Sequence, residues 1–387
     1  MIYVDNAATT AVHMSVLQAM EPYFTQLYGN PSAQHAAGHA AHEGMHKARN
    51  TVASCLGCTD REIIFTASGS EADNQALRTA VAWGKAHGRN HVVTVAIEHP
   101  AILRTLDALQ KEEDIEVSRV TPTHEGVITP EAVAELLRPT TCLVSVMTLN
   151  NEVGTLQPVH LISEKAHKAG ALFHTDAVQA MGHVPYTMDD YGADMLSLSA
   201  HKFHGPKGIG ALICRESAFN QKLEPVSLVY GGGQERGHRA ATENIPGMVG
   251  LATALKEATD CIQEYLAHVY KLRTHLMEGL LEIPGSHLMG DPNARVGILN
   301  ICFEDVNREA LVTLLDREGI CASAGSACAA GAVSISPVLR AMGVPQNIAA
   351  GALRISFNLD NTDNEMNTVI SAVRDVVKHL RSVRTEE

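Results

Sequence analysis

One lysine of this chain directly follows a short apolar run, in the segment Ser199-Ala200-His201-Lys202, and the turn Gly205-Pro206 comes soon after it. A lysine amine forms an imine with a carbonyl compound once desolvation or a nearby cation lowers its pKa. The serine and the histidine before it can hold an anionic group through hydrogen bonds. Two lysines near a turn, here Lys202 and Lys207, are ordinarily solvated surface residues, so this segment alone is a weak indication.

Four other polar clusters also follow apolar runs. Ser68-Gly69-Ser70-Glu71 suits a phosphate at a helix N-terminus, although many helices begin this way without a ligand. Glu98-His99-Pro100 offers an acid, a base or a ring-stacking partner, whereas the amides of Asn150-Asn151-Glu152 could equally form a turn. In His174-Thr175-Asp176-Ala177-Val178-Gln179, a buried aspartate needs a cation such as a protonated ring nitrogen, unless it is a helix N-cap. Ligands of an open parallel sheet bind beyond the carboxyl ends of its strands, so this ordered set predicts one ligand site.

The apolar runs that precede these clusters alternate with longer helical patterns. They cover residues 62–66, 92–97, 143–148, 171–175, 194–198 and 209–214. Such alternation is typical of βαβ units, so we predict an α/β domain with a largely parallel sheet covered on both faces. Helix starts between the runs are well marked, as in Thr129-Pro130-Glu131, which offers an N-cap, a proline and an acidic first turn.

The pattern changes in the last third of the chain. After a helical stretch over residues 250–281, strands at 297–303 and 353–357 accompany a helix at 308–318, which predicts a smaller α+β domain. We therefore predict a large domain over residues 15–255 and a small domain formed by residues 1–14 together with 256–387. No Pro/Ser/Gly linker separates the two, so we expect them to pack closely.

Composition limits the possible partners. The 387 residues carry a formal net charge of −13, which argues against nucleic acid or an anionic membrane as the main partner. No apolar stretch is long enough to cross a bilayer, and the first residues do not form a signal peptide, so we expect a cytoplasmic protein. Eight cysteines in such a protein are expected to be free thiols, important where they are reactive.

With these ordered clusters, the chain closely resembles the NifS/IscS-type cysteine desulfurases of the class-V aminotransferase group. The resemblance spans nearly the whole chain. Its matching stretches are residues 3–10, 28–32, 68–74, 98–100, 150–154, 174–179, 199–210, 231–244 and 323–328. It implies the type I fold of pyridoxal-phosphate-dependent transferases, with a mostly parallel, seven-stranded-type sheet in the large domain.

The resemblance also implies how the cofactor would be held. Lys202 would be the Schiff-base lysine for pyridoxal 5'-phosphate and Asp176 the partner of its ring nitrogen. The other expected cofactor contacts are Gln179 and Asn151 at the ring hydroxyl, Gly69, Ser70, Ser199 and His201 at the phosphate, His99 on the ring, and Thr242 at the phosphate held by a second subunit. The role of Thr242 implies a homodimer.

Two further residues carry the reaction in that resemblance. Cys328 would attack the sulfur of L-cysteine and keep it as a persulfide, while Arg354, together with Asn151, would bind the substrate carboxylate. His99 and Lys202 would move protons. The product would be L-alanine, and the persulfide sulfur would pass to an iron–sulfur scaffold or another acceptor protein.

Other functions stay open on the sequence alone. A selenocysteine lyase or another class-V aminotransferase would depend less on Cys328. A cofactor-free interaction protein on the same fold is disfavoured, because it would have no use for Lys202, Asp176 and His201 together. The chain also departs from the family at Ala241, where a glycine usually precedes the threonine, and at Ser70, where many relatives have threonine.

Two patterns resemble metal sites. Cys55 and Cys58 have the spacing of a zinc or redox pair, but no second pair accompanies them. A helical histidine stripe, formed by His35, His39, His42 and His46, more often is a polar face. We therefore expect no resident metal.

Overall fold

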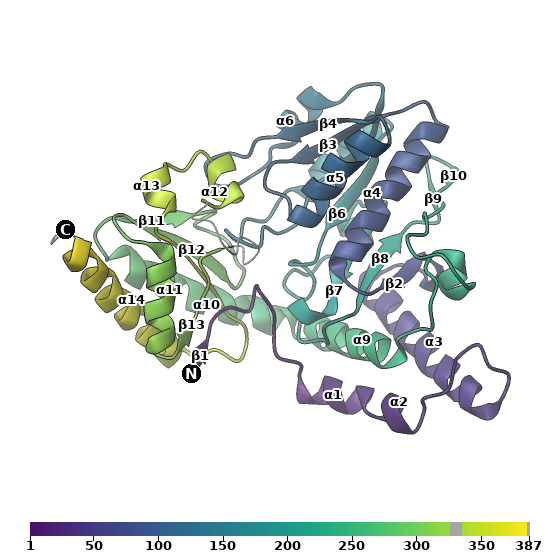
Figure 1. The fold of residues 1–387 in the computed structure, drawn as a ribbon, viewed down its shortest axis with the longest axis horizontal. Helices are drawn as coiled ribbons and strands as arrows, with labels where there is room; N and C mark the ends of the chain where they lie inside the picture. Colours follow the sequence, from purple (N-terminus) through teal and green to yellow (C-terminus); the bar gives the residue numbers. More distant parts are fainter. Residues whose placement is uncertain (326–334, 385–387) are drawn as a thin grey trace.

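The computed structural model describes residues 1–325 and 335–384, and its centre is a seven-stranded sheet (Figure 1). The strand order is β2-β8-β7-β6-β5-β3-β4. The strands are β2 (Ile63–Thr66), β3 (His91–Val95), β4 (Glu116–Val120), β5 (Thr141–Ser145), β6 (Leu172–Asp176), β7 (Met195–Ser199) and β8 (Gly210–Cys214). The five from β4 to β7 run parallel, and β8 is antiparallel to both of its neighbours. The predicted mostly parallel sheet is confirmed.

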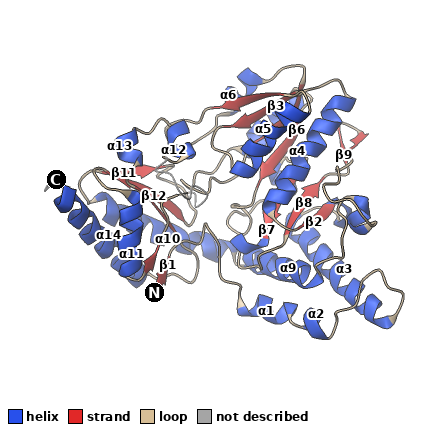
Figure 2. Ribbon diagram, in the orientation of Figure 1, coloured by secondary structure: helices blue, strands red, loops and turns tan. Residues whose placement is uncertain are grey.

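Helices cover both faces of this sheet (Figure 2). Neighbouring residues of one strand belong to different apolar cores, as Leu172 and Phe173 of β6 do. The first core takes in α4 (Gly69–Ala86) and α5 (Pro100–Glu112), and the second takes in α3 (Ala36–Leu56), α7 (Val159–Lys168) and α9 (Ile245–Asp260). Since side chains alternate along a strand, continuous apolar runs are what a sheet buried on both faces requires.

Within the seven-stranded sheet, the sequence missed one strand, the edge strand β4. Its residues, Glu-Val-Ser-Arg-Val, are mostly exposed or half-buried, and only Val120 is buried. An edge strand with polar side chains lacks the apolar run that revealed the other six. The predicted helix start at Thr129 is correct: its side chain accepts a hydrogen bond from the Ala132 N–H at the beginning of α6 (Pro130–Leu136).

A second, antiparallel sheet lies in the C-terminal part, with the order β11-β12-β14. Its strands are β11 (Ser286–Met289), β12 (Ile298–Phe303) and β14 (Ala352–Ser356), and its helices are α10 (Ile262–Leu281), α11 (Arg308–Arg317) and α14 (Asp363–Arg384). The N-terminal strand β1 (Ile2–Tyr3) pairs with β13 (Ile320–Cys321), so the start of the chain packs with its C-terminal part (Figure 1).

The apolar cores bear on how the chain divides. Val4 shares a third core with α10, α11 and α14. Ile298 and Leu339 of the C-terminal part belong instead to the second core, with α3, α7 and α9. We therefore keep as a proposal the division into residues 15–255 and residues 1–14 with 256–387, with a close apolar contact between the two parts. Among the described residues, no helix is long and apolar enough to cross a membrane.

Candidate active site

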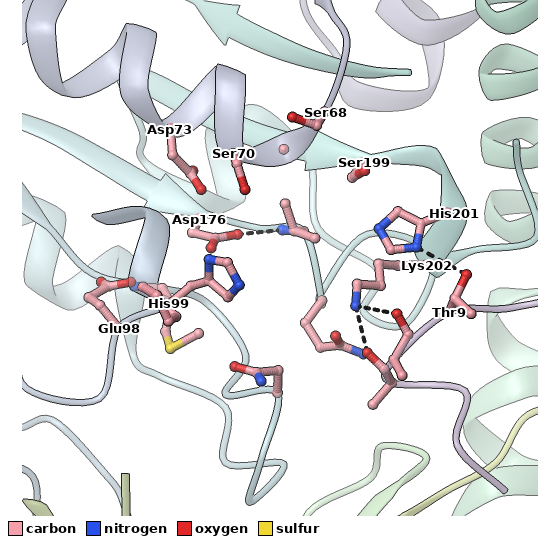
Figure 3. Close-up of a pocket in the computed structure, with 18 of the residues that line it drawn as sticks. Thr9, Ser68, Ser70, Asp73, Glu98, His99, Asp176, Ser199, His201 and Lys202 are labelled. Carbon is pink, nitrogen blue, oxygen red and sulfur yellow. Dashed lines mark hydrogen bonds between the residues drawn. The ribbon is translucent and has the colours of Figure 1, made fainter. Parts of the chain in front are cut away.

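A cavity of about 560 Å³ opens beyond the carboxyl ends of the parallel strands (Figure 3). It contains ten of the residues predicted from the sequence. They are Gly69, Ser70, His99, Asn151, Asp176, Gln179, Ser199, His201, Lys202 and Arg354. They come from both sheets and from connections more than 280 residues apart in the chain (354 − 69 = 285). The strand-exit argument therefore predicted the position of this cavity.

Lys202 lies in a short 3-10 turn, η2 (Ala200–Lys202), that follows β7. Its Nζ donates hydrogen bonds to the carbonyl oxygens of Ala7 and Ala8, at 2.6 and 2.9 Å. The N-terminal segment thus holds the amine at the cavity from the side opposite the sheet (Figure 3). A primary amine held this way stays within reach of a carbonyl group in the cavity.

The helix N-terminus of α4 forms one wall of the cavity. Ser68 caps this helix by accepting the Glu71 N–H, and Gly69 and Ser70 begin its first turn. A Cβ added at Gly69 would lie only 2.5 Å from Val178 Cγ2, so the close packing of this turn against the β6 exit requires glycine. The free N–H groups of a helix N-terminus and a serine hydroxyl are suited to an anion such as phosphate.

Asp176 ends β6 and is buried. Its Oδ1 accepts the Val178 N–H at 2.9 Å. Burial raises the pKa of Asp176, while His99 and Lys202 oppose that increase. A buried carboxylate in such a position is stabilised by a cation, and a protonated ring nitrogen would supply one.

His99 caps α5, where its Nδ1 accepts the Ala101 N–H at 3.1 Å. Since Nδ1 is an acceptor, the neutral ring carries its hydrogen on Nε2. Burial lowers the pKa of His99, although Asp176 raises it. Figure 3 shows the His99 ring beside Asp176, at the centre of the cavity.

The second sheet contributes Arg354 from β14. Its guanidinium donates to the Asp5 carboxylate at 2.8 Å and to the Asn151 carbonyl at 2.9 Å. The buried Nε has no hydrogen-bond partner in the part of the chain that the structure describes. A guanidinium with an unused donor at a cavity suits a carboxylate ligand.

The family model for class-V aminotransferases matches residues 2–369. The chain belongs to this family. It is 42% identical to the cysteine desulfurase IscS of Methanosarcina thermophila, covering 99% of this chain and 93% of that one. It is also 44% identical to a cysteine desulfurase of Cereibacter sphaeroides, in a match that covers 99% of this chain and 97% of that protein. Within the class-V family, the chain therefore belongs to the cysteine desulfurases, as the sequence resemblance predicted.

Solved structures of this family have the same fold. A NifS-like protein, 36% identical, matches with a TM-score of 0.89 over 98% of this chain and 99% of its own. A structure described as SspA in complex with cysteine is 34% identical and matches with a TM-score of 0.79. The match covers 92% of this chain and 99% of that one. Members of the class-V family are pyridoxal-phosphate enzymes of fold type I, and the predicted fold class is confirmed.

The cavity fits the cofactor of this family. Besides the cradle at Gly69 and the buried Asp176, Gln179 presents an oxygen, Oε1, that is buried and has no partner among the described residues. A ring hydroxyl would satisfy it. His201 accepts or donates a hydrogen bond at Thr9 through Nδ1, at 3.2 Å, and burial lowers its pKa to about 4, so its ring is neutral.

One predicted residue, Thr242, is not among those that line the cavity, and another, Cys328, cannot be compared with it. Thr242 lies exposed on the loop before α9. Cys328 lies outside the described residues, so its position stays a prediction. The chain on either side of it borders the cavity: Ser323 pairs with Arg354 through two backbone hydrogen bonds, and Pro337 and Val338 line the wall.

Sequence reasoning assigned no role to several residues that the fold brings to this site. The carbonyls of Ala7 and Ala8 belong to the matched stretch 3–10, but a carbonyl that accepts from a lysine leaves no trace in residue type. Asp73 lies in the matched stretch 68–74 and lines the cavity, where its burial is nearly complete. The only sequence signal was a carboxylate on the apolar face of a helix.

Proposed function

We propose that this chain is a pyridoxal-phosphate-dependent cysteine desulfurase that converts L-cysteine into L-alanine and keeps the sulfur as a persulfide on Cys328. The observation that carries the proposal is one cavity that holds an amine, Lys202, opposite a buried carboxylate, Asp176, with the guanidinium of Arg354 at its edge. The desulfurases that this chain resembles over their full length support the same activity.

Pyridoxal phosphate, when bound, supplies a carbonyl carbon for the amine and a ring that accepts electrons. Gly69, Ser70, Ser199 and His201 would hold its phosphate. The Asp176 carboxylate would keep a proton on the ring nitrogen, because a nearby negative charge favours the protonated, positively charged form of that nitrogen.

Arg354 and Asn151 would hold the substrate carboxylate, and this orients the α-proton toward the amine of Lys202. The Nζ of Lys202 would then take that proton, with the neutral ring of His99 close enough to donate or accept a second one. Both residues lie in the same cavity in the structure, as the proposal requires.

The sulfur step is assigned to Cys328. Its thiolate attacks the substrate sulfur, so an S–S bond forms and the Cβ–S bond breaks. The electron pair of the broken bond stays with the substrate β-carbon, which takes up one proton, and the return of a proton to the α-carbon completes alanine. The sulfur then leaves Cys328 by attack of an acceptor thiol.

We propose a homodimer in which Thr242 reaches the phosphate bound by the partner subunit. The exposure of Thr242, away from the cavity of its own chain, supports this. So do large apolar side chains on α1 (Met14–Met20), α2 (Pro22–Thr25) and the loop after α2: Met14 is 66% exposed, Phe24 59% and Tyr28 72%. Such side chains are more often found at interfaces.

The sulfur acceptor is proposed to be a protein, with iron–sulfur cluster assembly as the leading use. The name IscS belongs to a relative and supports this use by analogy. A reducing compartment, the cytoplasm, is part of the proposal. The seven cysteines in the described part of the chain are free thiols, as such a compartment would keep them.

The test is to supply the purified, cofactor-loaded protein with L-cysteine and a reductant and to measure sulfide and alanine. Wild type should release both in equal amounts, and Cys328→Ala should release neither at a significant rate. Cys321→Ala is the matched control, since Cys321 is a half-buried thiol nearby in sequence that the mechanism does not use. Sulfide release that persists in Cys328→Ala would exclude the persulfide route.

The same assay separates the alternatives. A selenocysteine lyase would turn over selenocysteine but not cysteine, and an aminotransferase would need a 2-oxo acid and release no sulfide. Protein that stays colourless after addition of pyridoxal phosphate would rule out all three enzymes.

A further inference from the structure

Asp73 is a buried carboxyl that the proposed mechanism does not use. It lies in α4, its exposure is 1%, and its Oδ1 has no hydrogen-bond partner within the described chain. One polar atom of Asp73, one of His99 and one of Asp176 all lie within 4.8 Å of one another. Figure 3 shows the side chain pointing from the helix toward Asp176.

A line of neutral polar groups lies behind Asp73. His174 of β6 contacts the Ser145 hydroxyl at 2.9 Å through Nδ1 and the Ser197 hydroxyl at 3.0 Å through Nε2. The Ser197 side chain also faces Asp73 and lowers the pKa of that carboxyl. These groups come from β5, β6 and β7, so they cross the sheet, and all three are fully buried.

This line supplies no positive charge. Burial lowers the pKa of His174 to about 3, so the ring is neutral although its Nε2 lies 3.8 Å from Asp73 Oδ1. If Ser145 donates to His174, and His174 to Ser197, the Ser197 hydroxyl is left to donate to one oxygen of Asp73. Asp73 Oδ1 has no donor among the residues that the structure describes.

The remaining charged groups also disfavour an ionised Asp73. Glu98 and His99 face it from the connection after β3, and His174 and Asp176 face it from β6. Burial raises the pKa of Asp73 well above its ordinary value, and Asp176 and Glu98 raise it further. Glu98 is itself buried and its pKa is raised, mainly by burial. Lys202 lowers the pKa of Asp176.

We propose that Asp73 is a positioning residue that stays protonated beside Asp176, so that Asp176 is the one negative charge on this wall of the cavity. The proposal rests on the proposed function, because the charge of Asp176 matters when a cofactor nitrogen is its partner. An ionised Asp73 would repel Asp176 and favour its protonation, which would remove the anion that the ring nitrogen needs. Asp73 as a neutral acid lies beside Asp176 without that repulsion.

Two substitutions and one control test this. Asp73→Asn keeps the shape and the neutral charge, so it should behave as wild type, whereas Asp73→Ala removes the side chain that lies beside Asp176. Glu98→Gln is the matched control, because Glu98 is equally buried in the same wall and its Oε1 accepts the Met147 N–H.

The first measurement is the infrared difference spectrum of the full-length holoenzyme, wild type minus Asp73→Asn, between about pH 6 and 9. We expect the carbonyl band of a protonated carboxylic acid, unchanged over that range. A carboxylate band in its place would overturn the proposal. This spectrum does not depend on whether cysteine is a substrate, so failure of the desulfurase assay would leave it intact.

The second measurement is the dissociation constant for pyridoxal phosphate and the pH at which the absorption of the bound cofactor changes. Asp73→Asn should stay within about twofold of wild type, and Asp73→Ala should bind about tenfold more weakly with a shifted absorption transition. Equal losses in both variants, or no loss in either, would overturn the positioning role. If Asp73→Ala does not fold, the Asn variant and the infrared band still decide.

Discussion

The substitution Arg354→Lys tests the proposed substrate clamp most directly. Arg354 is 2% exposed, its two terminal nitrogens donate to Asp5 and to the Asn151 carbonyl, and its Nε has no partner among the described residues. A lysine keeps the positive charge but presents a single ammonium group in place of a planar fork. It can therefore hold Asp5 or a substrate carboxylate, but not both with good geometry.

The expected size follows from these contacts. Loss of one charge-assisted hydrogen bond to the substrate carboxylate costs about 1.5–3 kcal/mol, which corresponds to roughly 10- to 150-fold in binding. Because the lost contact is made to the bound substrate as well as in the transition state, most of the loss should appear as an increase in KM for cysteine, with a smaller change in kcat. The lost contact with Asp5 also lowers the free energy of unfolding, by about 1–3 kcal/mol.

The assay is steady-state alanine formation over a range of cysteine concentrations, together with urea unfolding. Arg273→Lys is the matched control: Arg273 is 1% exposed and donates to the carbonyls of Asp291 and Pro292, but it does not line the cavity. It should lose stability while KM stays constant. If Arg354→Lys leaves KM within about twofold, or if both variants raise it equally, the clamp argument is refuted.

Three further outcomes follow from the same geometry. Lys202→Arg keeps the cation but cannot condense with a carbonyl, so turnover should fall by about 10³-fold or more and the visible absorption of the loaded protein should disappear. Burial lowers the pKa of His99, so the fall in kcat/KM caused by protonation of its ring should occur below pH 6.5. His99→Gln should abolish this fall on the acid side of the pH profile. If the fall persists in His99→Gln, another group causes it. The pKa of His174 is about 3 in the folded protein against an ordinary 6.5, so the unfolded chain takes up its proton first as the pH falls. The stability due to neutral His174 is thus full above pH 6.5 and decreases by about 1.4 kcal/mol per pH unit between those values. Urea midpoints of wild type and His174→Gln from pH 7 to about pH 5 would show it, and parallel curves would contradict it.

The sequence by itself predicted six of the seven strands of the main sheet and most of the polar residues that line the cavity. Six strands were visible because a strand buried on both faces is rich in apolar residues, and β8 with its residues Gly210–Cys214 is an example. The polar residues Asp176, His99 and Lys202 were predictable as one site, because parallel strands end at one edge of a sheet and each of these residues follows a strand. The edge strand β4 was missed because its polar side chains face solvent.

Only the tertiary structure decided the partners of these residues. Lys202 binds the Ala7 and Ala8 carbonyls across about 195 positions of the chain, and Arg354 binds Asp5 across 349. A backbone carbonyl has no residue type by which a sequence could announce it, and the position of Arg354 depends on how the second sheet packs against the first. The proximity of Asp73 to Asp176 has the same origin, since a helix face and a strand end meet only after the core of α4 is buried. Local polarity therefore encodes which groups reach the site, whereas their charge states depend on burial and neighbours that exist only in the folded chain.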